Sequence, residues 1–335
     1  SVNGISATRS GQRSGDNFRN PFSDPATPMM PRRRHHAFAL LIALATAAAS
    51  AQGQGSSRAA TSPLSLDSMV VSTEWLAARL SDPRVVVVEV TVNDSARAVA
   101  IPGSRLVSYR RMAVIRDSIN NELPTVDSLR ALAEALGISD DTRVVVYADE
   151  APMATRLLMS LDYIGHTRFS YLDGGLVKWQ AERRPVVSVE PTITRGSITP
   201  RPRPETVVAA DWITPRLGKP GLALIDTRTD GEYNGTGNRS GMPSAGHLAG
   251  ARQLEWETLF SGHDGLQLKP LPELRRLFDE RTKGGDTVVT YCWVGYRASA
   301  TYFVARLLGY DARLYDGSYQ DWQRRKLPTK AGTTP

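Results

Sequence analysis

The chain has 335 residues, of which 41% are hydrophobic and 22% charged, a composition typical of a globular protein long enough for two domains. A net charge of +7 would suggest a nucleic-acid partner if the cations were spread along the chain. Residues 1–51, however, hold six arginines against two acids and so account for +4 of that charge. No basic tract interleaved with aromatic residues follows, so we expect no nucleic-acid binding.

The first predicted element is a targeting segment. Met29 or Met30 precedes a basic run, the apolar stretch 37–49 and an Ala-Ser-Ala site that ends at Ala51. This is the pattern of a secretory signal peptide, and the apolar stretch is too short to span a membrane. We expect cleavage after Ala51, a periplasmic or secreted protein and no stable membrane association, with an uncleaved anchor as the alternative. Residues 1–28 are interpreted as an upstream extension.

After a polar linker (52–66), the same order of elements is predicted twice, about 143 residues apart. The first copy has a helix at Thr73–Leu80, a strand at Val85–Val90, a helix at Val126–Leu136 and a strand at Val144–Tyr147. The second has corresponding segments at Ala210–Pro215, Ala223–Asp226, Leu271–Arg281 and Val288–Tyr291. Each copy ends with an Asp-Gly pair and a tryptophan, Asp173 with Trp179 and Asp316 with Trp322.

Strands that alternate with helices predict a parallel sheet flanked by helices. Because the pattern recurs, the sequence predicts two tandem α/β domains, 67–188 and 207–331. The Pro- and Arg-rich segment 189–206 would be the linker between them.

Cys292 is the single cysteine of the chain, and it lies where the predicted strand gives way to a helix beginning near Arg297. A lone thiol cannot form an intramolecular disulfide, so it is either an inert core residue or the site of chemistry. The helix N-terminus and Arg297 would favour a thiolate, and Gly295 in the same turn favours the nucleophile. An exported protein is expected to keep paired cysteines or none, which makes a retained single thiol more informative.

The repeat offers an internal comparison for this residue. Alignment from the strand places Ala148 opposite Cys292, whereas alignment from the Asp-Gly pair places Asp149 there. Neither residue is a sulfur nucleophile, and the first copy also lacks the glycine and arginine of the loop. We therefore predict that the first domain is catalytically silent and serves as a packing partner that walls one side of the site.

The chain resembles the tandem-domain rhodaneses, which are thiosulfate sulfurtransferases and their mercaptopyruvate-using relatives. The resemblance covers Met69 to about Lys330 and rests on four motifs in the family's order: Asp226-Thr227-Arg228 with Glu232-Tyr233-Asn234-Gly235, then Gly246-His247-Leu248-Ala249-Gly250-Ala251, then the loop Cys292 to Arg297, then Asp316-Gly317 with Trp322. It implies two rhodanese-like domains, each a parallel sheet flanked by helices, without a cofactor or metal.

The resemblance also implies a reaction. Cys292 would attack the outer sulfur of thiosulfate, sulfite would leave, and the persulfide would pass its terminal sulfur to cyanide or a thiol with ping-pong kinetics. Arg228 and Arg297 would bind the anionic donor, and the alternative for Arg228 is a structural pair with Glu232 or Asp226. The loop residues Trp293, Val294, Gly295 and Tyr296 would complete the binding site, and Asp226, Glu232 and His247 would hold the structure around it.

Departures from the family pattern bear on the donor. Glu232 replaces an arginine common in long relatives, and Trp293 stands where mercaptopyruvate-using members have a small residue, so thiosulfate is favoured over mercaptopyruvate. The lysine often found in the loop of thiosulfate enzymes is absent, and Arg297 would replace its charge.

A reactive cysteine at the end of a strand also occurs in other classes of protein. A cysteine phosphatase or arsenate reductase would need Cys-x5-Arg, but four residues separate Cys292 from Arg297. A persulfide carrier or a non-catalytic binding module stays open as the alternative. We expect a monomer.

Overall fold

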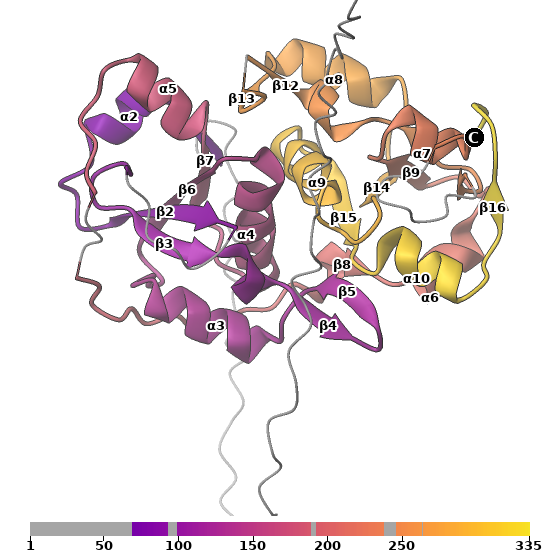
Figure 1. Ribbon diagram of the computed structural model, residues 1–335. Coiled ribbons are helices and arrows are strands. Elements are labelled where there is room, and N and C mark those ends of the chain that lie inside the picture. The colour runs from indigo at the N-terminus through magenta and orange to yellow at the C-terminus, as the bar shows by residue number, and fades with distance from the viewer. Residues whose placement is uncertain (1–68, 93–98, 189–191, 238–245, 263) are drawn as a thin grey trace, which may run out of the picture. The chain divides into compact units, whose positions relative to one another are not determined.

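The computed structural model describes residues 69–335 except 93–98, 189–191, 238–245 and 263 (Figure 1). The predicted upstream extension, signal peptide and first linker lie outside the described residues. The described residues belong to one compact unit. In the described ranges, no helix is long and apolar enough to cross a membrane.

The first repeat builds a five-stranded parallel sheet in the order β1-β7-β6-β2-β3. Its strands are β1 (Val70–Val71), β2 (Val85–Thr91), β3 (Arg105–Ser108), β6 (Arg143–Ala148) and β7 (Phe169–Leu172). Its α-helices are α2 (Thr73–Ala77), α3 (Val126–Ala135), α4 (Ala151–Tyr163) and α5 (Gly175–Ala181). The 3-10 helix η1 (Tyr109–Met112) leads into an antiparallel hairpin of β4 (Val114–Arg116) and β5 (Ile119–Glu122).

The second repeat builds the same sheet, again parallel, in the order β8-β15-β14-β9-β11. Its strands are β8 (Val207–Val208), β9 (Leu222–Asp226), β11 (Arg252–Gln253), β14 (Thr287–Tyr291) and β15 (Asp311–Tyr315). Its α-helices are α6 (Ala210–Ile213), α7 (Asp230–Asn234), α8 (Leu271–Asp279), α9 (Ala298–Leu307) and α10 (Ser318–Arg324).

Shorter elements complete this repeat. They are η2 (Pro204–Thr206), η3 (Thr214–Arg216), η4 (Trp256–Leu259) and the antiparallel pairs β10 (His247–Leu248) with β16 (Thr329–Lys330) and β12 (Phe260–Ser261) with β13 (Gln267–Leu268). Matching strand order in the two sheets confirms the predicted α/β fold of two tandem parallel-sheet domains.

Both faces of each sheet are covered, which explains why the central strands are continuous apolar runs. In β6, Val144 and Val146 face one buried cluster, whereas Val145 and Tyr147 face another. The first of these clusters spans both repeats. The two domains therefore share a core on one side instead of each enclosing its own, because α4 and α9 pack against each other (Figure 1).

The α4–α9 contact also contains buried polar groups. The hydroxyl oxygens of Thr155 and Ser299 lie 2.9 Å apart, and the Tyr302 hydroxyl donates to Asp162 at 2.7 Å. Such groups are costly to bury without partners, so these pairs fix how the two helices meet.

The structure decides between the two alignments of the repeats. In each sheet, a buried tyrosine near the end of the central strand, Tyr147 or Tyr291, donates to a carboxylate on the neighbouring strand. Matching the two tyrosines places Ala148 opposite Cys292. The extra residue of the first repeat lies further on, in the turn 166–168 between α4 and β7.

Candidate active site

Cys292 directly follows β14, the central strand of the second sheet, and its side chain is buried. Two hydrogen bonds to the start of α10 fix the backbone of Cys292. The Cys292 N–H donates to Ser318 Oγ at 3.3 Å, and the Tyr319 N–H donates to the Cys292 carbonyl at 3.1 Å. The thiol therefore has a fixed place at the carboxyl edge of a parallel sheet, where ligands commonly bind in such folds.

The loop 293–297 separates the cysteine from α9. Within the described part of the chain, the backbone N–H groups of Trp293, Val294, Gly295 and Arg297 donate to no other group. Gly295 has a φ of 75°, and a Cβ there would lie 2.8 Å from a backbone carbonyl oxygen, so the turn requires glycine. A cluster of open N–H groups beside a helix N-terminus is a binding site for an anion.

Arg297, at the end of this loop, forms a buried bidentate pair with Glu232. Its Nη1 and Nη2 donate to the two carboxylate oxygens, each at 2.7 Å. Glu232 also accepts from the Thr229 backbone N–H at 3.2 Å and closes the capping box of α7. Burial alone would raise the pKa of Glu232, but hydrogen bonds and charge from Arg297 lower it to about 2. The charge of Arg297 is therefore largely compensated.

Arg228 is fully buried beside Asp226. Its Nε and Nη2 donate to the carboxylate at 2.6 to 3.1 Å, and Nη2 also donates to the Gly246 carbonyl at 2.8 Å. The guanidinium lies over the Tyr319 ring at 4.0 Å. Nη1 has no hydrogen-bond partner among the described residues. This geometry favours the structural pair of Arg228 with Asp226, and contact with a donor through Nη1 stays a prediction.

The remaining predicted residues surround this core. His247 stacks on Tyr233 at 3.8 Å, and both of its ring nitrogens lie within 3.2 Å of backbone carbonyl oxygens, so its contacts are those of a structural residue. Trp293 is half-buried, with its ring 5.4 Å from that of Tyr319.

Residues of the first repeat also reach the loop, although they belong to none of the motifs in the sequence. Asn121 Nδ2 donates to the Val294 carbonyl at 2.6 Å. The Tyr296 hydroxyl donates to Glu150 at 2.8 Å, and its ring meets Tyr109 edge-on at 5.1 Å. Nothing in the local sequence marks Asn121 as a site residue, because its contact depends on how the two repeats pack.

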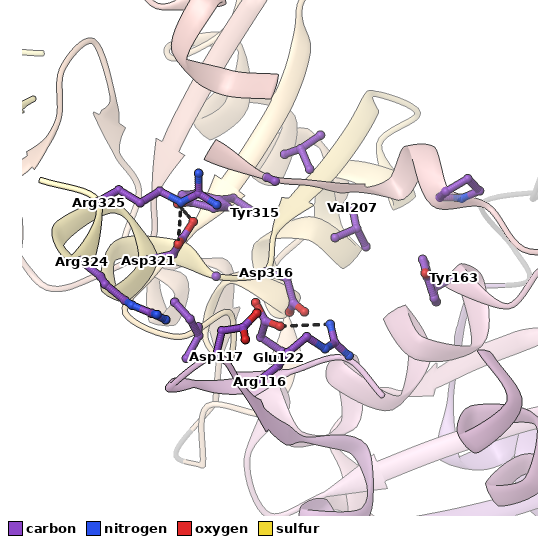
Figure 2. Close-up of a pocket in the computed structure, with 15 residues that line it drawn as sticks. Arg116, Asp117, Glu122, Tyr163, Val207, Tyr315, Asp316, Asp321, Arg324 and Arg325 are labelled. Atoms are coloured by element: carbon purple, nitrogen blue, oxygen red, sulfur yellow. Dashed lines mark hydrogen bonds and ion pairs between the residues drawn. The ribbon is translucent and has the colours of Figure 1, made fainter. Parts of the chain in front are cut away.

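A cleft of about 640 Å³ adjoins the site (Figure 2). Figure 2 shows Arg116 and Glu122 of the β4–β5 hairpin on one side, paired at 3.1 Å, and Asp321 and Arg325 of the α10 region on the other, paired at 2.8 Å. Asp316 forms part of the wall, but Cys292 and loop 293–297 do not line the cleft. Within the described ranges, no three His, Cys, Asp or Glu side chains gather as a metal site would require.

The candidate site is thus one thiol at the carboxyl end of the central strand, in the second of two repeated α/β domains. The rhodanese-like domain family matches residues 72–182 and 209–325. The chain is 31% identical to the thiosulfate sulfurtransferase of Azotobacter vinelandii, over 76% of this chain and 93% of that protein. It is 34% identical to the sulfur carrier protein TtuD of Thermus thermophilus, over the same shares.

Among solved structures, SseA from Escherichia coli, described as a 3-mercaptopyruvate sulfotransferase, matches with a TM-score of 0.66 and 22% identity, over 75% of this chain and 99% of that one. At that identity the match shows the fold alone. The family match and the 31% identity to the Azotobacter vinelandii protein show that the chain belongs to the rhodanese family of sulfurtransferases.

Proposed function

We propose that this protein transfers the outer sulfur of thiosulfate to a thiophilic acceptor, cyanide or a thiol, through a persulfide on Cys292. The observation that carries the proposal is the group of open backbone N–H donors in the loop that follows this cysteine. They offer an anion several donors beside the one thiol of the chain.

The reaction proceeds in two displacements. The Cys292 thiolate attacks the outer sulfur of thiosulfate, a new S–S bond forms, and the old S–S bond breaks as sulfite leaves with the electron pair. Cyanide or a thiolate then attacks the terminal sulfur of the persulfide, takes it, and returns the cysteine to its thiolate. Splitting the transfer this way is covalent catalysis, and the donor and acceptor bind in turn.

The charge around the loop supports thiosulfate over mercaptopyruvate. A carboxylate-bearing donor needs a guanidinium of its own, but Glu232 already occupies both terminal nitrogens of Arg297. The bulky Trp293 also directly follows Cys292 in the chain, where mercaptopyruvate-using members have a small residue. Thiosulfate is compact and can be held by the backbone N–H groups, and Nη1 of Arg228, which has no hydrogen-bond partner among the described residues, offers a further donor.

Intact mass spectrometry tests the proposal directly. Incubation with thiosulfate should add one sulfur atom to the wild-type protein, and cyanide should remove it with formation of thiocyanate. Cys292→Ser should gain no sulfur. An unmodified wild-type protein, or an adduct that persists in the serine variant, would contradict the mechanism.

A persulfide carrier is a second candidate, favoured by the 34% identity to the sulfur carrier protein of Thermus thermophilus. A carrier should form the same adduct but turn over slowly with thiosulfate and cyanide in the steady state. An enzyme should show ping-pong kinetics with both small molecules.

We also propose that the protein is exported. The signal-like pattern before Ala51 supports a mature protein that begins at Gln52 outside the cytoplasm. Cell fractionation followed by N-terminal sequencing would test this, and a full-length chain recovered from the cytoplasm would contradict it.

A further inference from the structure

Two carbonyl groups fix loop 293–297, one to each repeat. The Trp293 carbonyl accepts from the Gln320 N–H of α10 at 3.0 Å, and the Val294 carbonyl accepts from Asn121 Nδ2 of β5 at 2.6 Å. In a trans peptide the C=O and the following N–H point in opposite directions. Each of these bonds therefore also sets the direction of an N–H group, that of Val294 in the first case and that of Gly295 in the second.

The direction of the Gly295 N–H depends on the first repeat. The N–H groups of Val294 and Gly295 donate to no other group in the part of the chain that the structure describes, so both are left for an anion. Glycine restricts its own backbone less than any other residue, and the peptide before Gly295 therefore needs a hydrogen bond from outside the loop to fix it. Asn121 supplies that bond.

Asn121 is itself held on three sides. It is 3% exposed, its side-chain oxygen accepts from the Tyr109 hydroxyl, and its backbone carbonyl accepts from Nη2 of Arg156 at 2.6 Å. Because the Val294 carbonyl can only accept, the amide nitrogen must face it, which leaves the amide oxygen for Tyr109. The backbone of Asn121 has a φ of 64°, a conformation that asparagine adopts more readily than most residues.

The neighbouring residues attach β5 to the second repeat by other bonds. The Asn120 N–H donates to Gln320 Oε1 at 3.0 Å, and the Leu123 N–H donates to Asp316 Oδ2 at 2.6 Å. The other Asp316 oxygen lies 2.8 Å from Nη1 of Arg156, whose side chain is fully buried. Because backbone N–H groups make two of these contacts, the strand keeps its place when the side chain between them is removed.

We propose that Asn121 is a positioning residue of the active site, supplied by the first repeat, which orients the Gly295 N–H toward a bound anion and is itself oriented by Tyr109. This rests on the proposed function in one respect, that loop 293–297 binds an anion beside Cys292. The first repeat then does more than pack against the second, because it sets the direction of a donor in a loop that it does not itself contain.

The test compares two alkylating reagents at one pH. Iodoacetate is an anion and iodoacetamide is neutral and similar in size, and both react with the same sulfur, so the ratio of their rates is independent of how far the thiol is ionised. In folded wild type this ratio should exceed that of the protein unfolded in urea, because the loop binds an anion. In Asn121→Gly it should fall roughly three- to tenfold, since one hydrogen bond to a charged group commonly contributes that much or more. Glycine keeps the left-handed backbone, so only the side chain is lost.

Tyr109→Phe removes the hydroxyl that orients the amide and keeps the ring that meets Tyr296. It should lower the ratio roughly two- to threefold, because the amide loses one partner but stays in place. In the Asn121→Gly background it should have no further effect, since the hydroxyl acts through the amide. Tyr302→Phe is the matched control, because it removes a hydroxyl from another buried contact between the repeats, that with Asp162. It should lower stability and leave the ratio unchanged, and circular dichroism would confirm that each variant is folded.

An unchanged ratio in folded Asn121→Gly, additive effects in the double variant, or equal ratios in folded and unfolded wild type would overturn the proposal. If Asn121→Gly does not fold, the comparison of Tyr109→Phe with Tyr302→Phe decides. If neither reagent reaches the folded thiol, the half-saturating thiosulfate concentration for adduct formation replaces the ratio and should rise by the same factor.

Alkylation does not require sulfur transfer, so the two proposals fail separately. The expected ratios without a thiosulfate adduct would refute only the proposed function, and the adduct with unchanged ratios would refute only the role of Asn121. A folded thiol that neither the reagents nor thiosulfate modify would refute both.

Discussion

The substitution Glu232→Gln tests how much the charge of the Glu232–Arg297 pair contributes to stability, because it keeps the length of the side chain. Glutamine has the same length and can still serve in a capping box, so the substitution removes mainly the negative charge. The pKa of Glu232 is lowered from its ordinary 4.5 to about 2 in the folded protein, against the burial that would raise it, by Arg297. At about 1.4 kcal/mol per pH unit, this corresponds to about 3 kcal/mol of stability from the charged form at neutral pH.

The sign of the pH dependence follows from the lowered pKa. The stabilisation is fully present above the unfolded-state value near 4.5 and is lost as the pH falls toward 2, because the unfolded chain then binds a proton that the folded chain resists. Glutamine cannot titrate. The stability difference between wild type and Glu232→Gln should therefore be about 3 kcal/mol at neutral pH and less than half of that near pH 3.

Urea denaturation at several pH values measures this difference. Glu280→Gln is the matched control, because Glu280 forms an exposed pair with Arg276, four residues earlier in the chain. Such a pair contributes at most about 0.5 kcal/mol at any pH, so the control should stay close to wild type. A difference for Glu232→Gln that is small at neutral pH, or equal at neutral and acidic pH, would refute the reasoning.

Three further substitutions test the loop and the contact between the repeats. Gly295→Ala should slow persulfide formation roughly tenfold or more, because a Cβ at a φ of 75° meets a backbone carbonyl; a mass-spectrometric time course checks it, and a wild-type rate would count against the tight turn. Asn121→Ala frees the Val294 carbonyl and should slow the same step roughly tenfold while costing about 1 kcal/mol of stability, as the same time course and urea denaturation would show. Asp162→Asn removes a buried carboxylate that binds two arginines and a tyrosine, and should cost about 3 kcal/mol in urea denaturation. Unaltered stability would show that this network contributes little.

The sequence predicted the fold well because its strongest signals are local. Continuous apolar strands such as Val144–Tyr147, alternating with helices, indicate a parallel sheet covered on both faces, and the structure has two of them. Element ends were less accurate. The helix predicted over 73–80 ends at Ala77 and is followed by turns at 78–81.

The site was predictable only where its residues share a motif. Cys292 and Arg297 stand in one loop, and their spacing could be read directly. The partner of Arg297 could not, because the pair with Glu232 joins residues 65 apart in the chain. Asn121 and Arg156 belong to the other repeat. Arg156 left one trace, a single arginine in the middle of a helix that is otherwise uncharged until Asp162, and a buried contact at that position was a reasonable inference.

The two repeats differ in the loop that follows the central strand. Helix α4 begins three residues after Ala148, whereas α9 begins six residues after Cys292. The loop before the helix is therefore longer in the second repeat by nearly one helical turn. Because these residues are not helical, the carbonyls of Trp293 and Val294 have no hydrogen-bond partners from a helix. A buried carbonyl without a partner destabilises the fold, so each needs another donor. The Gln320 N–H donates to the Trp293 carbonyl at 3.0 Å, and the side-chain amide of Asn121 donates to the Val294 carbonyl. One of these two donors comes from the copy without a thiol, so the open loop depends on both repeats.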